Sequence, residues 1–174
     1  MCVIVDANRL SLVFSTPRSR DHALLLDWIT DKGGALVYGG TTYLAELCKV
    51  ATAHRMIAQL LKAGRAFRAP DKLVDDESRI VAPRCTSNDA HIIALARVTS
   101  TRVLCSDDQA LVADFKNHEL VPPPKGAVFK DATHAHLLQH VTACPGAKAP
   151  TQALRPCATG KRKTMKRKRV QVET

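Results

Sequence analysis

A chain of 174 residues with 45% hydrophobic residues is long enough for one domain with a full core and too short for two. It has no apolar run of the length, about 18 residues, that a transmembrane helix needs. Its first residues lack the basic start and long apolar stretch of a signal peptide. Six cysteines without a Cys-x-x-Cys pair argue against a zinc site. We therefore expect a cytoplasmic protein with reduced thiols and no membrane contact.

The net charge of +10 is distributed unevenly. From Pro145 onward, nine Lys or Arg residues against one acid account for +8 of it. Residues 144–174 have no periodic apolar pattern, so we predict a folded domain over 1–143 followed by a disordered basic tail. The tail supplies candidate nucleic-acid contacts at Lys161, Arg162, Lys163, Lys166, Arg167, Lys168 and Arg169. A localisation signal and a solubilising tail are the alternatives.

Taken in chain order, the apolar pattern predicts an α/β domain with a mainly parallel central sheet. Buried strands are predicted at 1–6, 35–38 and 103–105, and an edge strand at 128–129. Helices are predicted at 21–29, 41–66, 72–80, 90–96, 107–115 and 134–141. In the longest of these, apolar residues recur at helical spacing at Leu44, Leu47, Cys48, Ala51, Ala58 and Leu61. The stretch 7–20 is mixed, with some apolar residues that cover a core edge.

Acidic residues stand where the predicted strands end and where helices begin. Asp6 directly follows the first strand, Asp107 follows the strand at 103–105, and Asp89 opens the helix at 90–96. Glu46 interrupts an otherwise apolar stretch and needs a partner there. Because chemistry in open α/β sheets lies outside the carboxyl ends of the strands, we expect these carboxylates to meet at one point. Their mutual repulsion is relieved by hard divalent cations such as Mg²⁺ or Mn²⁺.

The segments around these acids resemble the four acidic blocks of PIN-domain nucleases, in the same order. The blocks are Val3-Ile-Val-Asp6-Ala-Asn8, Tyr43-Leu-Ala-Glu46-Leu, Ser87-Asn-Asp89-Ala-His-Ile-Ile-Ala-Leu-Ala96 and Val103-Leu-Cys-Ser-Asp107. Their spacing is similar to that of small single-domain ribonucleases of the virulence-associated toxin type. Cys105 occupies a position where that family commonly has Thr, and the adjacent Asp108 is the alternative to Asp107 as the fourth acid.

The resemblance implies a three-layer α/β/α fold and a metal-dependent endoribonuclease acting on RNA. The implied Mg²⁺ or Mn²⁺ ligands are Asp6, Glu46, Asp89 and Asp107. We expect Asn8 and Ser106 to orient these carboxylates, and Arg9 to contact a phosphate. Since such nucleases often act as toxins held by an antitoxin protein and often form homodimers, an antitoxin and a second copy of the chain are the implied partners.

Other interpretations of the same residues remain open. A non-catalytic RNA-binding or scaffold protein with a PIN fold would keep the basic tail without the reaction. A structure-selective DNA nuclease would share the acids. Taken singly, Asp6 could stabilise a turn and the other aspartates could cap helices. His91 follows Asp89 closely enough to line a pocket, and we expect it to play a supporting or structural role.

Overall fold

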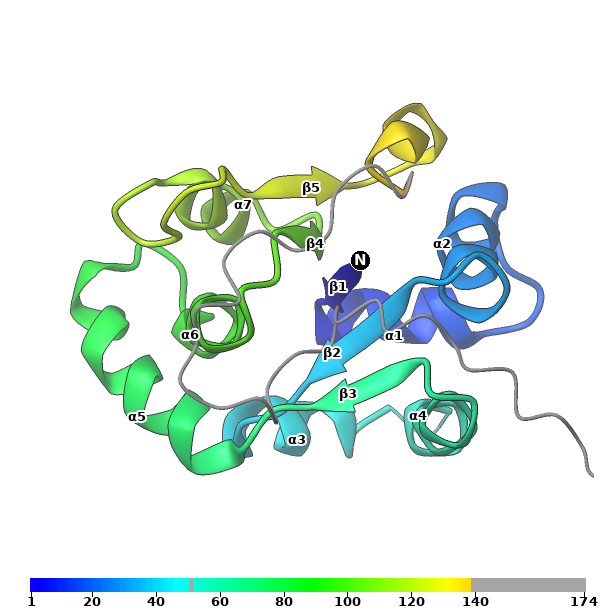
Figure 1. Ribbon diagram of the computed structural model, residues 1–174, viewed down its shortest axis with the longest axis horizontal. Coiled ribbons are helices and arrows are strands. Elements are labelled where there is room, and N and C mark those ends of the chain that lie inside the picture. Colours follow the sequence, from blue (N-terminus) through cyan, green and yellow to red (C-terminus); the bar gives the residue numbers. More distant parts are fainter. Residues whose placement is uncertain (51, 139–174) are drawn as a thin grey trace, which may run out of the picture.

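The computed structural model describes residues 1–50 and 52–138. Five strands form an all-parallel sheet in the order β3-β2-β1-β4-β5, and helices flank the sheet (Figure 1). The strands are β1 (Cys2–Val5), β2 (Ala35–Tyr38), β3 (Ala66–Arg68), β4 (Val103–Cys105) and β5 (Ala127–Phe129). The α-helices are α1 (Ala7–Phe14), α2 (Arg20–Thr30), α3 (Thr41–Leu47), α4 (Ala53–Lys62), α5 (Asp71–Val81), α6 (Ala90–Thr99) and α7 (Gln109–Lys116), and the 3-10 helices are η1 (Ala82–Arg84) and η2 (Ala132–Leu138).

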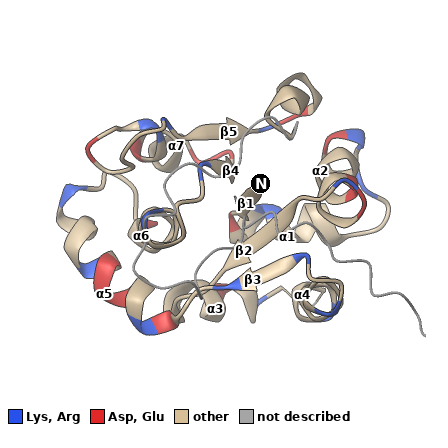
Figure 2. Ribbon diagram, in the orientation of Figure 1, with Lys and Arg blue, Asp and Glu red and all other residues tan. Residues whose placement is uncertain are grey.

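The α/β class and the parallel sheet confirm the prediction. The central strand β1 is buried along its whole length and pairs in parallel with β2 on one side and β4 on the other. Charged residues are almost absent from the strands and lie on helices and loops (Figure 2). Since all strands run the same way, the residues that follow β1, β2 and β4 gather at one edge of the sheet. That edge carries Asp6, Gly39 and Ser106.

The predicted helix over residues 41–66 is wrong. Helix α3 ends at Leu47, where the Lys49 and Val50 N–H groups donate to the carbonyls of Glu46 and Leu47, each at 3.0 Å. Cys48 is exposed and Leu61 is 45% exposed, so the apolar stripe drawn through both is also wrong. The turn instead redirects the chain and puts Lys49 close to Glu46.

The boundaries of several other elements differ from those predicted. Residues 7–14, interpreted as mixed, form α1, and residues 66–68, which lie at and just after the predicted end of the long helix and were assigned no strand, form β3. The last predicted helix is a 3-10 helix over Ala132–Leu138. The predicted disordered tail, residues 144–174, lies outside the described residues, as do the basic residues predicted within it. In the described part of the chain, every helix is too short or too polar to cross a bilayer.

Helix α3 is held at its first turn by side chains of α5. The Gly40 N–H donates to Asp71 Oδ1 at 3.1 Å and the Thr41 N–H donates to Asp75 Oδ1 at 2.8 Å. These carboxylates satisfy amide groups that a helix start leaves without an intrahelical partner. Gly39 precedes this turn at φ +142°, where an added Cβ would lie 2.6 Å from the Ala69 carbonyl oxygen. Helix α5 in turn packs along α6, so α3, α5 and α6 form a connected unit on one side of the sheet.

Candidate metal centre

A polar pocket of about 230 Å³ opens at the carboxyl edge of the sheet. Three of the four predicted acids line it, although they come from separate parts of the chain: Asp6, Glu46 and Asp89. The other lining residues are Ala7, Asn8, Lys49 and Val50. The predicted convergence of Asp6, Glu46 and Asp89 is therefore present in the geometry of the pocket.

Asp6 is fixed by hydrogen bonds to both of its carboxylate oxygens. It caps the N-terminus of α1, where Oδ1 accepts the Asn8 backbone N–H at 3.2 Å. The Ser106 hydroxyl, fully buried at the end of β4, donates to Oδ2 at 2.7 Å. Both residues expected to orient the acids thus contact Asp6, Asn8 through its backbone and Ser106 through its side chain. Asp6 itself is only 6% exposed, so its charge is held in a fixed position.

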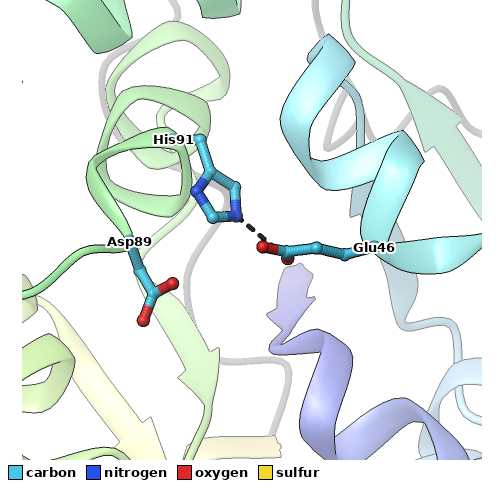
Figure 3. A group of neighbouring side chains, drawn as sticks. All are labelled: Glu46, Asp89 and His91. Atoms are coloured by element: carbon cyan, nitrogen blue, oxygen red, sulfur yellow. Dashed lines mark hydrogen bonds and ion pairs between the residues drawn. The ribbon is translucent and has the colours of Figure 1, made fainter. Parts of the chain in front are cut away.

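Glu46 reaches the pocket from the last turn of α3. The buried Tyr43 of the same helix donates its hydroxyl hydrogen to the Val5 carbonyl at the end of β1, which ties α3 to the central strand. The Glu46 carboxylate then meets His91 on α6, with 3.2 Å between Oε2 and the imidazole Nε2 (Figure 3). Ligand atoms of Glu46, Asp89 and His91 all lie within 4.8 Å of one another.

Asp89 is half-buried at the N-terminus of α6. Burial raises the pKa of its carboxyl group above 3.8, and the charges of Asp6, Glu46 and Asp108 raise it further, while His91 lowers it. The pocket therefore concentrates negative charge that its own residues only partly compensate. A divalent cation would relieve this repulsion, because carboxylate oxygens are its preferred ligands.

The backbone before Asp89 is held by an acid that the sequence analysis missed. The buried Asp114 on α7 accepts hydrogen bonds from the Thr86 N–H at 2.9 Å, the Thr86 hydroxyl at 2.6 Å and the Ser87 N–H at 2.8 Å. The Ser87 hydroxyl oxygen then accepts the Asp89 N–H at 3.3 Å. An acid inside the otherwise apolar run of α7 was the available signal for this role.

Asp107 and Asp108 occupy different environments. Asp107, 56% exposed, forms an ion pair with Arg9 and does not line the pocket. Asp108 caps α7 by accepting the Leu111 N–H at 2.7 Å, and its charge acts on Asp89. Its own N–H donates to Ser106 Oγ at 3.0 Å. Of the two candidates for the fourth acid, Asp108 is the one whose charge raises the pKa of Asp89.

Three further residues, which were predicted or which neighbour the pocket, have defined environments. Arg9, expected to contact phosphate, has its guanidinium group paired with Asp107 and 3.5 Å from His22 Nε2. Burial raises the pKa of the Cys105 thiol to about 12, so this residue stays protonated at neutral pH and serves as core of β4. Lys49 also lines the pocket and was not singled out from the sequence.

Comparisons of the chain with protein-family models, curated proteins and solved structures found no match. The functional interpretation therefore rests on the pocket and on the residues that build it. The donor set of this pocket is rich in carboxylate oxygens, and one imidazole nitrogen adjoins them. Such a set fits Mg²⁺ and Mn²⁺ and does not resemble the thiolate sites of structural zinc.

Proposed function

We propose that this chain is a metal-dependent phosphodiesterase that cleaves RNA internally, with a PIN-like three-layer α/β/α fold. The observation that carries the proposal is that Asp6, Glu46 and Asp89 line one pocket at the carboxyl edge of a parallel sheet. The energetic cost of gathering three carboxylates there favours a site that holds divalent cations. RNA as the substrate is supported by the resemblance of the four acidic segments to PIN-domain nucleases.

In this proposal Asp6, Glu46 and Asp89 hold Mg²⁺ or Mn²⁺, and Asp108 or Asp107 supplies the fourth acid. A bound cation supplies the positive charge that activates a water molecule and stabilises the leaving 3′ oxygen of the phosphodiester. Ser106 and the Asn8 backbone keep Asp6 in one orientation. Lys49 at the pocket wall can contact the phosphate group that enters beside these acids.

Binding of the polyanionic substrate is supported by the charge of the chain as a whole. The net charge of +10 favours association with RNA, and the seven Lys and Arg residues between 161 and 169 neutralise phosphates. Removal of residues 161–174 is expected to flatten the salt dependence of RNA affinity, by up to about 5 units in the slope of log K against log salt.

We also propose, from the resemblance alone, a toxin function under the control of an antitoxin, and a homodimer.

A cleavage assay tests the proposal. The full chain is incubated with labelled single-stranded RNA or DNA of the same sequence, with Mn²⁺ or with EDTA. We expect RNA products with Mn²⁺, none with EDTA, and none from Asp6→Asn or Asp89→Asn. The matched control is Asp27→Asn, an acid-to-amide change at an exposed position on α2 that does not line the pocket. This control should cleave as the unmodified chain does.

The remaining outcomes separate the alternatives. Preferential cleavage of branched or flapped DNA would assign the chain to the structure-selective DNA nucleases. RNA binding without products, equal in Mn²⁺ and EDTA, would favour the non-catalytic RNA-binding or scaffold protein and refute the proposed reaction.

A further inference from the structure

A buried imidazole faces the acidic pocket. His91 lies in the first turn of α6, two residues after Asp89, and is 4% exposed. Figure 3 shows its ring directed toward Glu46 across the space between α6 and α3, with the Asp89 carboxylate beside it. From the sequence alone we expected a supporting or structural role for this residue. Its position at the acids themselves raises the question of direct contact with a cation.

The distances suit a shared ion. Two ligand atoms that each lie about 2.1 Å from a cation, at right angles, are about 3.0 Å apart. The Glu46 Oε2 and His91 Nε2 atoms are 3.2 Å apart, close to that separation. All three donor atoms, with Asp89 included, fall within 4.8 Å of one another.

We propose that His91 Nε2 binds the divalent cation directly, together with Glu46 and Asp89. The inference rests on the proposed metal-dependent function and specifies its metal. In this arrangement the imidazole is neutral, with its proton on Nδ1 and its Nε2 lone pair on the cation. Imidazole nitrogen suits first-row transition metals, whereas Mg²⁺ prefers oxygen ligands and keeps much of its water. The site therefore selects Mn²⁺, or a related transition ion, over Mg²⁺.

A purely supporting His91 would have different consequences. As a hydrogen-bond donor to Glu46, it would orient that carboxylate for every cation alike. Its loss would then weaken Mn²⁺ and Mg²⁺ binding by similar factors, since removal of such a supporting group typically costs about 10-fold to 100-fold in metal affinity. A fall in affinity alone does not separate the two roles. Two other measurements separate them: the ratio of Mn²⁺ affinity to Mg²⁺ affinity, and the magnetic coupling between Mn²⁺ and the imidazole nitrogen.

The experiment uses the full chain loaded with Mn²⁺ and requires no cleavage. Pulsed electron paramagnetic resonance detects the coupling between Mn²⁺ and a bound imidazole nitrogen, and ¹⁵N-histidine labelling identifies the nitrogen as histidine. Mn²⁺ affinity is measured by titration, and Mg²⁺ affinity by competition. The variants are His91→Gln and, should it fail to fold, His91→Asn. His22→Gln is the matched control, because His22 contacts Ser19 and Arg9 and does not line the pocket.

We expect nitrogen coupling in the unmodified chain and in His22→Gln, and its loss in the His91 variants. The ratio of Mn²⁺ to Mg²⁺ affinity should fall about tenfold in those variants. Mn²⁺ binding that is lost in Asp89→Asn but shows no histidine coupling would overturn the role of His91 while leaving the proposed function intact. Absence of Mn²⁺ binding in the unmodified chain would refute both.

Discussion

Asp114 offers the sharpest test of how the pocket is supported. Its carboxylate accepts hydrogen bonds from three donors, namely the Thr86 N–H, the Thr86 hydroxyl and the Ser87 N–H. The change Asp114→Asn keeps the size of the side chain and removes its charge. It also turns an amide NH₂ group toward donors that need an acceptor. The loop that precedes Asp89 then loses most of its attachment to α7.

The expected cost follows from those contacts. A hydrogen bond to a charged group contributes about 1.5–3 kcal/mol, but Thr86 is exposed, so water replaces part of what is lost. With one amide oxygen still able to accept, we expect a loss of about 2 kcal/mol in the free energy of unfolding. For a chain of this length that lowers the melting temperature by roughly 4–8 °C.

The pH dependence provides an independent check. Burial disfavours the ionised form of Asp114, but the hydrogen bonds from Thr86 and Ser87 outweigh it and lower the pKa below 3.8. A carboxyl group whose folded-state pKa is depressed stabilises the fold above its unfolded pKa, and this contribution is lost as the pH falls through the folded-state pKa. The difference between the unmodified chain and Asp114→Asn should therefore be full at pH 7 and shrink as the pH falls below 3.8.

Urea unfolding at neutral and at acidic pH measures that difference. Asp27→Asn, a change at an exposed position on α2, is the control and should alter the free energy of unfolding by less than about 0.5 kcal/mol at both pH values. A loss at neutral pH below about 0.5 kcal/mol, the range of ordinary surface substitutions, would refute this account of Asp114. So would a loss of full size that does not diminish in acid.

Further substitutions test the pocket itself. Asp89→Asn should raise the melting temperature in EDTA at pH 7 by roughly 2 °C. The reason is that burial and the neighbouring carboxylates raise the pKa of Asp89, so its charge opposes folding above that pKa. An unchanged or lower melting temperature contradicts this. Ser106→Ala removes the 2.7 Å bond to Asp6 and should cost about 1–2 kcal/mol in urea unfolding and about tenfold in Mn²⁺ affinity. Asp108→Asn preserves a good helix cap but removes a charge that acts on Asp89, so Mn²⁺ affinity should fall about fivefold. Asp107→Asn should change that affinity less than about twofold, and the reverse order would make Asp107 the fourth acid.

Strands β1, β2, β4 and β5 were predictable because they are short apolar runs, whereas β3 over residues 66–68 was not predicted. Val3, Ile4 and Val5 are fully buried, as the run before Asp6 indicated. The helix over 90–96 was equally clear, since almost every position in it is apolar and buried. In both cases local composition and tertiary burial point to the same structure.

The long helix was mispredicted because helical periodicity continues through a turn that has no glycine or proline. The predicted stripe ran from Leu44 and Leu47 to Leu61, yet the backbone bonds at Lys49 and Val50 end the helix between them. The pairing of Glu46 with His91 was equally hidden, since it depends on how α3 and α6 approach each other and not on any local pattern. Such a tertiary contact is not displayed by a single sequence.

The connected unit of α3, α5 and α6 has a consequence for how a cation would be taken up. Glu46 and Asp89 repel each other, yet α3 is fastened to α5 by Asp71 and Asp75, and α5 lies along α6. The two acids are therefore already in place before an ion arrives. Under the proposed function, an incoming ion would meet carboxylates that are already in position, so its capture would require little ordering of the chain and would depend on how readily the ion sheds its own water.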